Sequence, residues 1–69
     1  MDIVIYITKH SEEKRIALGI TINEIKDALK YGSKSKQTDG LLATYRYLKV
    51  AYKKIGENTY KIKTIFMEK

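Results

Sequence analysis

Residues 56–66 read GENTYKIKTIF, and this stretch decides the fold class predicted for the chain. The Gly-Glu-Asn segment is typical of the turn of a β-hairpin. From Tyr60 to Phe66, one set of alternate residues holds tyrosine, isoleucine, threonine and phenylalanine, and the other holds two lysines and an isoleucine. A period of two indicates a β-strand with one buried face. The pattern therefore predicts a hairpin whose second strand spans residues 60–66.

The segment before this hairpin, residues 41–55, fits two periods. Its apolar side chains recur at helical spacing, but Leu48, Val50 and Tyr52 also alternate as they would in a strand. The β-branched and aromatic content favours strands. Because fifteen residues are long for one strand, we expect a break near Tyr47.

Two helices are predicted before these strands. Thr21 and Glu24 match a capping box, apolar residues follow at helical spacing, and Gly32 ends the run. A shorter helix precedes it, with Ser11 as the expected N-cap and Gly19 as the residue that ends it.

The remaining segments complete an α+β pattern. Residues 2–8 are apolar on both faces, which is typical of a central strand, and residues 33–40 predict a polar loop with a turn at Asp39-Gly40. The predicted order is strand, helix, helix, then two or three antiparallel strands, with both helices on one face of a mostly antiparallel sheet. With 69 residues, the chain makes a single domain, residues 1–69.

The composition excludes several classes of protein. The absence of cysteine excludes disulfides and thiolate metal sites, and a single histidine does not make a conventional zinc site. No apolar run approaches the ~20 residues that cross a bilayer, and no signal-peptide pattern is present. We therefore expect a cytoplasmic protein with no metal, no cofactor and no contact with a membrane. A chain this short buries only about 60% of its unfolded surface, which favours a homodimer, a partner or a very well packed core.

The positive charge is confined to the second half of the chain. Residues 33–69 carry eight lysines and Arg46 against three carboxylates, which accounts for the whole net charge of +6. Most of the tyrosines lie there too, and aromatic residues interleaved with cations suit stacking on bases and contact with phosphates. We therefore expect a nucleic-acid partner, with these candidate binding residues: Arg15, Tyr45, Tyr47, Lys49 and Lys53.

The same composition also arises without any nucleic-acid partner, in two ways. The lysines can be a solvated face, and the tyrosines, Tyr52 and Tyr60 above all, can be packing residues of the sheet. A proline-free chain rich in lysine and isoleucine is also what a hot-living host or an AT-rich genome produces.

A spaced set of residues carries a further signal. In the first half it comprises His10, Lys14, Leu18-Gly19-Ile20, Glu24-Ile25, Ala28-Leu29 and Gly32. In the second half it comprises Leu48-Lys-Val-Ala-Tyr52 and Tyr60-Lys-Ile-Lys-Thr64-Ile65. Over roughly residues 6–66, the set resembles a family of small uncharacterised domains with the pattern His-x-x-x-Arg-x-x-x-Arg-Gly-Ile. These domains look related to the BrnT and RelE toxins, and the resemblance implies a RelE-like, barnase-like fold.

The resemblance also implies an activity: a toxin that acts as a metal-independent endoribonuclease and pairs with an acidic antitoxin protein. In such a reaction a base takes the proton of the 2′-OH, cations stabilise the phosphorane, and an acid protonates the leaving oxygen. The candidate catalytic residues are His10, Lys14, Arg46 and Thr64, of which Thr64 is singled out by the resemblance alone.

The chain departs from the family pattern at two positions, because Lys14 and Leu18 stand where the family has arginine. A site without a guanidinium loses a bidentate phosphate clamp. Two hypotheses follow. The chain is a ribonuclease toxin with Arg46 supplying the missing cation, or it is a non-catalytic basic module that binds nucleic acid or a protein partner, of viral or plasmid origin.

Overall fold

The structure is a computed structural model, which places residues 3–68. These residues form five strands and two helices in the order β1 (Val4–Ile7), α1 (Lys9–Leu18), α2 (Ile22–Tyr31), β2 (Ser33–Gln37), β3 (Gly40–Tyr45), β4 (Leu48–Gly56) and β5 (Thr59–Met67).

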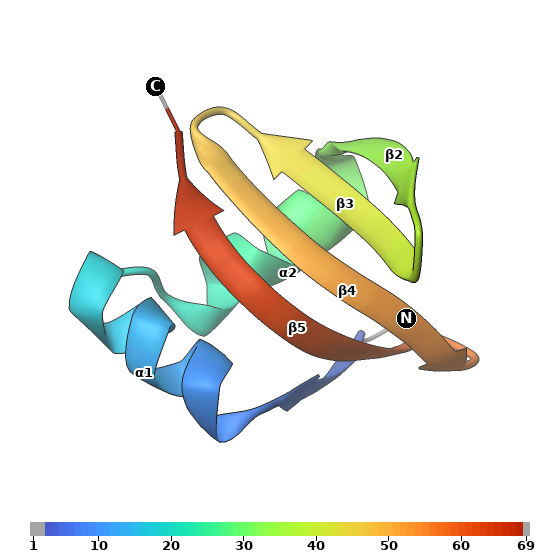
Figure 1. Ribbon diagram of the computed structural model, residues 1–69, viewed down its shortest axis with the longest axis horizontal. Coiled ribbons are helices and arrows are strands. Elements are labelled where there is room, and N and C mark those ends of the chain that lie inside the picture. The colour runs from blue at the N-terminus through green and yellow to red at the C-terminus, as the bar shows by residue number, and fades with distance from the viewer. Residues whose placement is uncertain (1–2, 69) are drawn as a thin grey trace.

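The strands make one sheet in the order β1-β5-β4-β3-β2 (Figure 1). β1 runs parallel to β5, and all other neighbouring strands are antiparallel. The α+β class, the mostly antiparallel sheet and the two helices are therefore confirmed. The ambiguous segment 41–55 forms strands, with its break at Arg46 and Tyr47 as predicted. The hairpin between β4 and β5 also lies where its turn residues indicated.

Two predictions about strands were wrong. The stretch 33–37, expected to be loop, is the edge strand β2, so four strands follow the helices. β1 lies at the other edge of the sheet and is not central, and the side chains of Val4 and Tyr6 on this strand are exposed. Asp2, at the start of the predicted first strand, lies outside the described residues.

Both helices begin after a threonine N-cap and end at a glycine. α2 has the predicted capping box: the Thr21 side chain accepts the Glu24 N–H (3.1 Å), and the Glu24 carboxylate accepts the Thr21 N–H (3.0 Å). α1 ends at Gly19 as predicted, in the left-handed conformation at φ 72°. Its N-cap, however, is Thr8 and not Ser11, because the helix begins three residues earlier than the position of Ser11 indicated.

The core lies between α2 and the sheet. α2 contributes Ile25, Ala28 and Leu29, whose spacing places them on one side of the helix. The sheet contributes a matching set from β3, β4 and β5: Ala43, Leu48, Val50, Tyr52, Ile62 and Ile65. In Figure 1, α2 crosses behind the sheet at β4.

The two tyrosines expected to pack in the sheet do so. The rings of Tyr52 and Tyr60 meet edge to face, with their centroids 5.4 Å apart, and Tyr52 is almost fully buried. Burial, with Tyr60 nearby, raises the pKa of the Tyr52 phenol above its usual value.

α1 lies beside β5 (Figure 1), and a small polar contact joins the two elements. Ser11 is fully buried, and its hydroxyl donates to the carbonyl oxygen of Ile62 (3.2 Å). The Thr8 hydroxyl donates to the Ser11 oxygen (2.9 Å), and it also accepts the Ser11 backbone N–H. These two hydroxyls join the start of α1 to the middle of β5, while Ile16 on α1 remains exposed.

An irregularity in β5 changes which side chains face the core. Ala51 of β4 pairs with Thr64, but the next residue of β4 pairs with Ile62, so Lys63 is an extra residue in β5. Residues an odd number apart in a regular strand point to opposite faces. Because of this β-bulge, Ile62 and Ile65, three residues apart, point to the same face, and both are fully buried. The predicted alternation of residues 60–66 therefore holds only as far as Ile62, and Thr64 and Phe66 lie on the opposite face from the core.

Candidate nucleic-acid interface

The sheet has a second face, formed by the side chains that point away from the core. Successive residues of a strand point to opposite faces, so each core residue of β3, β4 and β5 is followed by one on this outer face. Directly paired residues on neighbouring strands share a face. We call the resulting surface the open face, and its residues are Tyr6, Leu42, Thr44, Lys49, Ala51, Lys53, Lys61, Thr64 and Phe66.

Two rows of the open face each pair an aromatic ring with lysine. In one row, Tyr6 of β1 pairs with Lys61 of β5, and Lys61 pairs with Lys53 of β4. In the other row, Phe66 of β5 pairs with Lys49 of β4. Cross-strand partners have Cβ atoms about 5 Å apart, so each row sets an aromatic side chain beside a lysine side chain. The Nζ of Lys49 also lies 4.0 Å from the Glu68 carboxylate.

The side chains of the row between these two are uncharged. Thr64 pairs with Ala51, and Ala51 pairs with Leu42. Ala51 is only 6% exposed, since the longer side chains around it reach further from the sheet. The open face thus has a row of short, uncharged side chains between two rows that each hold an aromatic residue and lysine. Unpaired bases stack on such rings while lysines contact the phosphates.

Asp39, in the turn between β2 and β3, pairs with two lysines at the border of this face. Its carboxylate lies 3.4 Å from the Lys53 Nζ and 3.5 Å from the Lys63 Nζ. Lys63 also donates to the backbone carbonyl oxygen of Asp39. A hydrogen bond and the positive charge of Lys53, together with Lys63, hold the pKa of the Asp39 carboxyl below its usual value.

A hollow of about 330 Å³ adjoins the Tyr6 row. It is lined by Tyr6, Ile7, Thr8, Ile55 and Lys61, and apart from the lysine and the threonine these side chains are apolar or aromatic. Thr8 is also the N-cap of α1, so the hollow lies at the start of that helix.

The predicted catalytic residues do not all come together. His10 is exposed on the first turn of α1, and Lys14 follows it by four residues on the same side of the helix. Thr64 lies on the open face, between the two aromatic rows.

Arg46 lies far from His10. The backbone N–H of Glu68 donates to the turn that contains Arg46 (2.8 Å), whereas Ser11, next to His10, contacts β5 at Ile62. Because Lys63 is bulged, the chain from Ile62 to Glu68 advances about five strand steps, or roughly 16 Å at about 3.3 Å each. The structure therefore does not place the Arg46 guanidinium opposite His10.

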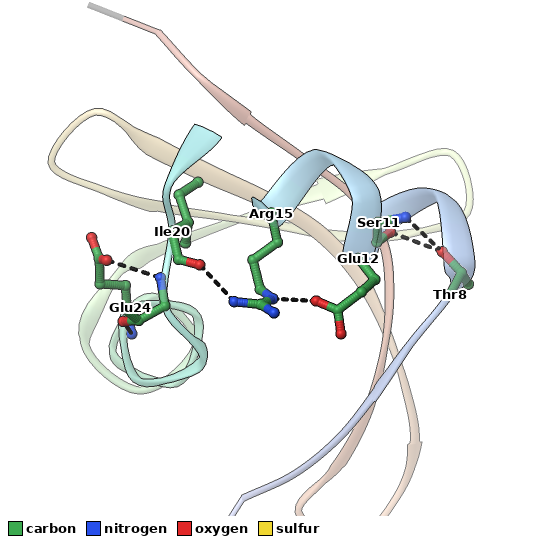
Figure 2. A network of polar contacts seen from close by, with 7 residues as sticks. Thr8, Ser11, Glu12, Arg15, Ile20 and Glu24 are labelled. Carbon is green, nitrogen blue, oxygen red and sulfur yellow. Dashed lines mark hydrogen bonds and ion pairs between the residues drawn. The ribbon is translucent and has the colours of Figure 1, made fainter. Parts of the chain in front are cut away.

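Among the predicted binding residues, Arg15 is already used inside the fold. Its guanidinium forms an ion pair with Glu12 and donates to the carbonyl oxygen of Ile20 (2.9 Å), which ties the end of α1 to the following turn (Figure 2). Lys49 and Lys53, two of the predicted binding residues, lie on the open face. Tyr45 is the last residue of β3 and pairs with Leu48 of the core face, and Tyr47 lies in the turn that follows. Neither belongs to the two aromatic rows.

The sequence reasoning missed Tyr6, Lys61 and Phe66. Tyr6 and Lys61 are neighbours only because β1 pairs in parallel with β5, a contact between residues 55 positions apart that no local pattern reveals. Strict alternation puts Phe66 on the core face, whereas the bulge at Lys63 places it on the open face. The lysines that alternate with apolar residues in 60–63 were the one available signal for Lys61.

Comparisons with protein family models, with curated proteins and with solved structures found no match to this chain. None of the helices within residues 3–68 has the length and apolar character needed to span a membrane. In the same part of the chain, no three side chains of histidine, cysteine, aspartate or glutamate are grouped so that they could hold a metal ion.

Proposed function

We propose that the protein binds single-stranded nucleic acid, RNA in the first instance, across the open face. The observation that carries this proposal is the pairing of Tyr6 with Lys61 and of Phe66 with Lys49 on one surface. Stacking on exposed rings requires bases that are free of a duplex, and about 1–3 kcal/mol per stacked base is typical. The whole +6 charge of the chain belongs to residues 33–69, which supply most of this face.

The test is a binding titration of fluorescent 12-mers: single-stranded RNA, single-stranded DNA and the RNA duplex of the same sequence. We expect both single strands to bind more tightly than the duplex. For three or four phosphate contacts, the logarithm of the binding constant falls with the logarithm of salt concentration at a slope of about −2 to −3. Equal affinity for strand and duplex, or a slope near zero, would contradict the proposal.

A second candidate function, metal-independent RNA cleavage, is favoured by the surroundings of His10. This residue is exposed on the first turn of α1, where the helix N-terminus favours bound phosphate, and Lys14 lies one turn further on. Lys61 lines the hollow that also includes Thr8, and Thr8 precedes His10 by two residues. In this candidate, Lys61 supplies the cation that the sequence analysis assigned to Arg46. The toxin interpretation, with a RelE-like fold and both helices on one face of the sheet, belongs to this second candidate.

Cleavage of labelled RNA in the presence of a chelator tests the second candidate. His10→Ala should abolish cleavage and leave RNA binding intact, and Lys14→Ala should slow it by about 100-fold, since one such cation is typically worth ~3 kcal/mol. If the protein binds RNA, but neither wild type nor His10→Ala cleaves it, then only the binding function stands. In the toxin interpretation, an acidic antitoxin would cover the same open face and compete with RNA for it.

A further inference from the structure

A second hollow, of about 270 Å³, lies between α2 and the turn that joins β3 to β4. Its lining includes two carboxylates from α2, Glu24 and Asp27, and two tyrosines, Tyr45 at the end of β3 and Tyr47 in the turn. Arg46 and the apolar side chain of Met67 also line it. Pockets for drug-sized ligands have volumes of about 300–1,000 Å³, so this hollow suits a smaller planar group such as one nucleobase.

The polar groups of this hollow retain unused bonding capacity. One oxygen of Glu24 accepts the Thr21 N–H in the capping box. Within residues 3–68, the Asp27 carboxylate has no hydrogen bond and no ion pair, and Arg46, although it lines the same hollow, does not pair with either carboxylate. The Arg46 guanidinium lies instead over the Tyr45 ring, 5.4 Å from its centroid.

The backbone of the turn has a positive φ at Arg46. Arg46 has φ 58°, in the left-handed region that long side chains seldom adopt. A two-residue hairpin turn needs a positive φ at its first central residue, so the turn itself accounts for this conformation. Arg46 is the one cationic residue that lines this hollow, and it lies between Tyr45 and Tyr47 in the chain.

The hollow is within reach of a strand bound on the open face. Lys49, which pairs with Phe66 on that face, follows Tyr47 by only two residues. Tyr47 itself is 58% exposed at the rim of the sheet. A nucleic-acid strand that leaves the Phe66 row therefore meets the turn next.

The chemistry of the lining selects among the bases. A carboxylate accepts hydrogen bonds and cannot donate them, so it is best satisfied by two adjacent N–H donors. Guanine presents such a pair on its Watson–Crick edge, at N1 and N2. Adenine and cytosine each place a ring-nitrogen acceptor beside their amino group, and uracil has a single donor between two carbonyl oxygens.

We propose that this hollow binds a guanine base of the nucleic-acid strand, with the two donors of guanine on Asp27 and its ring against Tyr45 and Tyr47. Arg46 then contacts an adjacent phosphate. The inference rests on the proposed function, because it assigns a base preference to the strand that the open face binds.

The test uses the intact protein and two kinds of probe. Amide NMR signals of residues 45–48 are followed during titration with each of the four 5′-mononucleotides, and fluorescent uridine 8-mers with and without one guanosine are bound in parallel. We expect GMP to bind at least tenfold more tightly than AMP, CMP or UMP, and the guanosine-containing oligomer to bind more tightly than oligouridine. Equal binding of GMP and AMP overturns the inference.

Two variants and a control make the assignment specific. Asp27→Asn should remove the preference for GMP over AMP, and Tyr47→Leu should weaken binding of all four mononucleotides by at least fivefold. Glu57→Gln removes one negative charge in the turn before β5, and it should change neither result. An undiminished GMP preference in Asp27→Asn overturns the inference. Tight binding of oligouridine without a guanosine preference overturns the guanine inference and leaves the proposed function of the open face standing. Failure of every oligomer to bind refutes the proposed function. The GMP titration then decides on its own whether the hollow binds guanine.

Discussion

The Nζ of Lys53 lies 3.4 Å from the carboxylate of Asp39, at the border of the open face. The same carboxylate lies 3.5 Å from the Nζ of Lys63, the extra residue of the β5 bulge. Asp39 is exposed, so water and salt screen both pairs. The three residues form a charge cluster in which Asp39 offsets part of the positive charge that the open face offers to phosphate.

This relationship predicts that Asp39→Asn strengthens RNA binding. Without the carboxylate, Lys53 and Lys63 no longer have an anion to replace when a phosphate arrives, so affinity at low salt should rise several-fold. The slope of affinity against salt should steepen by up to about 0.7 for each added phosphate contact. Fluorescence titrations between about 50 and 200 mM salt measure both quantities. Glu57→Gln makes the same change in net charge outside the cluster, and an equal gain from that variant would contradict the prediction.

Asp39 also predicts a pH dependence of stability. Its pKa is lower in the folded protein than the value of 3.8 for a free side chain, so the folded state stabilises the ionised carboxylate. This contribution is complete above the unfolded pKa and is lost as the pH falls through the folded pKa. Urea unfolding of wild type and Asp39→Asn should therefore differ near neutral pH and converge as the pH falls below 3.8 and through the lower pKa of the folded state. A difference that persists in acid would show that Asp39 acts by some means other than its charge.

Because Ser11 is buried and hydrogen-bonded, removal of its hydroxyl group should lower the stability of the protein. In Ser11→Ala the Thr8 hydroxyl loses its acceptor and the Ile62 carbonyl loses a donor, and each buried bond is worth about 0.5–1.5 kcal/mol. We expect unfolding to become easier by about 1–2 kcal/mol, a large share of the ~3–10 kcal/mol expected for a domain of this size. Ser35→Ala, at an exposed position of β2, is the matched control and should change stability by less than about 0.5 kcal/mol.

Two glycines provide a further matched pair of variants. A Cβ on Gly32 would lie 2.5 Å from the Ala28 carbonyl oxygen and 2.7 Å from that of Thr44, so the backbone joining α2 to β2 would have to shift. A Cβ on Gly56 would meet only ordinary contacts, the nearest at 3.5 Å. Thermal unfolding should show Gly32→Ala destabilised by more than about 1 kcal/mol and Gly56→Ala close to wild type. Equal melting temperatures would contradict this account of the α2–β2 junction.

The sequence allowed the local features of the fold to be predicted, because each depends on residues close together in the chain. The capping box at Thr21, the helix end at Gly19 and the hairpin after Gly56 all follow from short-range chemistry. β2 was missed because its serines, lysines and glutamine have low strand propensity and all five residues are exposed. Only its pairing with β3 makes it a strand.

The candidate site was predictable to a smaller extent. Lys49 and Lys53 were candidates because the positive charge and most tyrosines lie in the second half of the chain, and both lie on the open face. Whether they bind nucleic acid stays a prediction. The one-residue bulge at Lys63 reverses the face of every later side chain in β5, so strict alternation puts Phe66 on the wrong side. The position of Arg46 depends on where the β3–β4 turn lies relative to α1, a tertiary relationship that spacing along the chain does not encode.

The central claim, that the open face binds single-stranded nucleic acid, is tested most directly by a pair of charge-reversal variants. Lys49→Glu with Lys53→Glu alters the open face. Lys34→Glu with Lys36→Glu makes the same change in net charge on β2, where the register with Ala43 and Leu41 puts both side chains on the opposite face.

Circular dichroism first confirms that both double variants are folded, and RNA affinity is then measured at one low salt concentration. We predict that the open-face variant binds the single-stranded 12-mer at least tenfold more weakly than the β2 variant does. Equal weakening by the two variants would show that net charge alone attracts the RNA, and it would contradict the account.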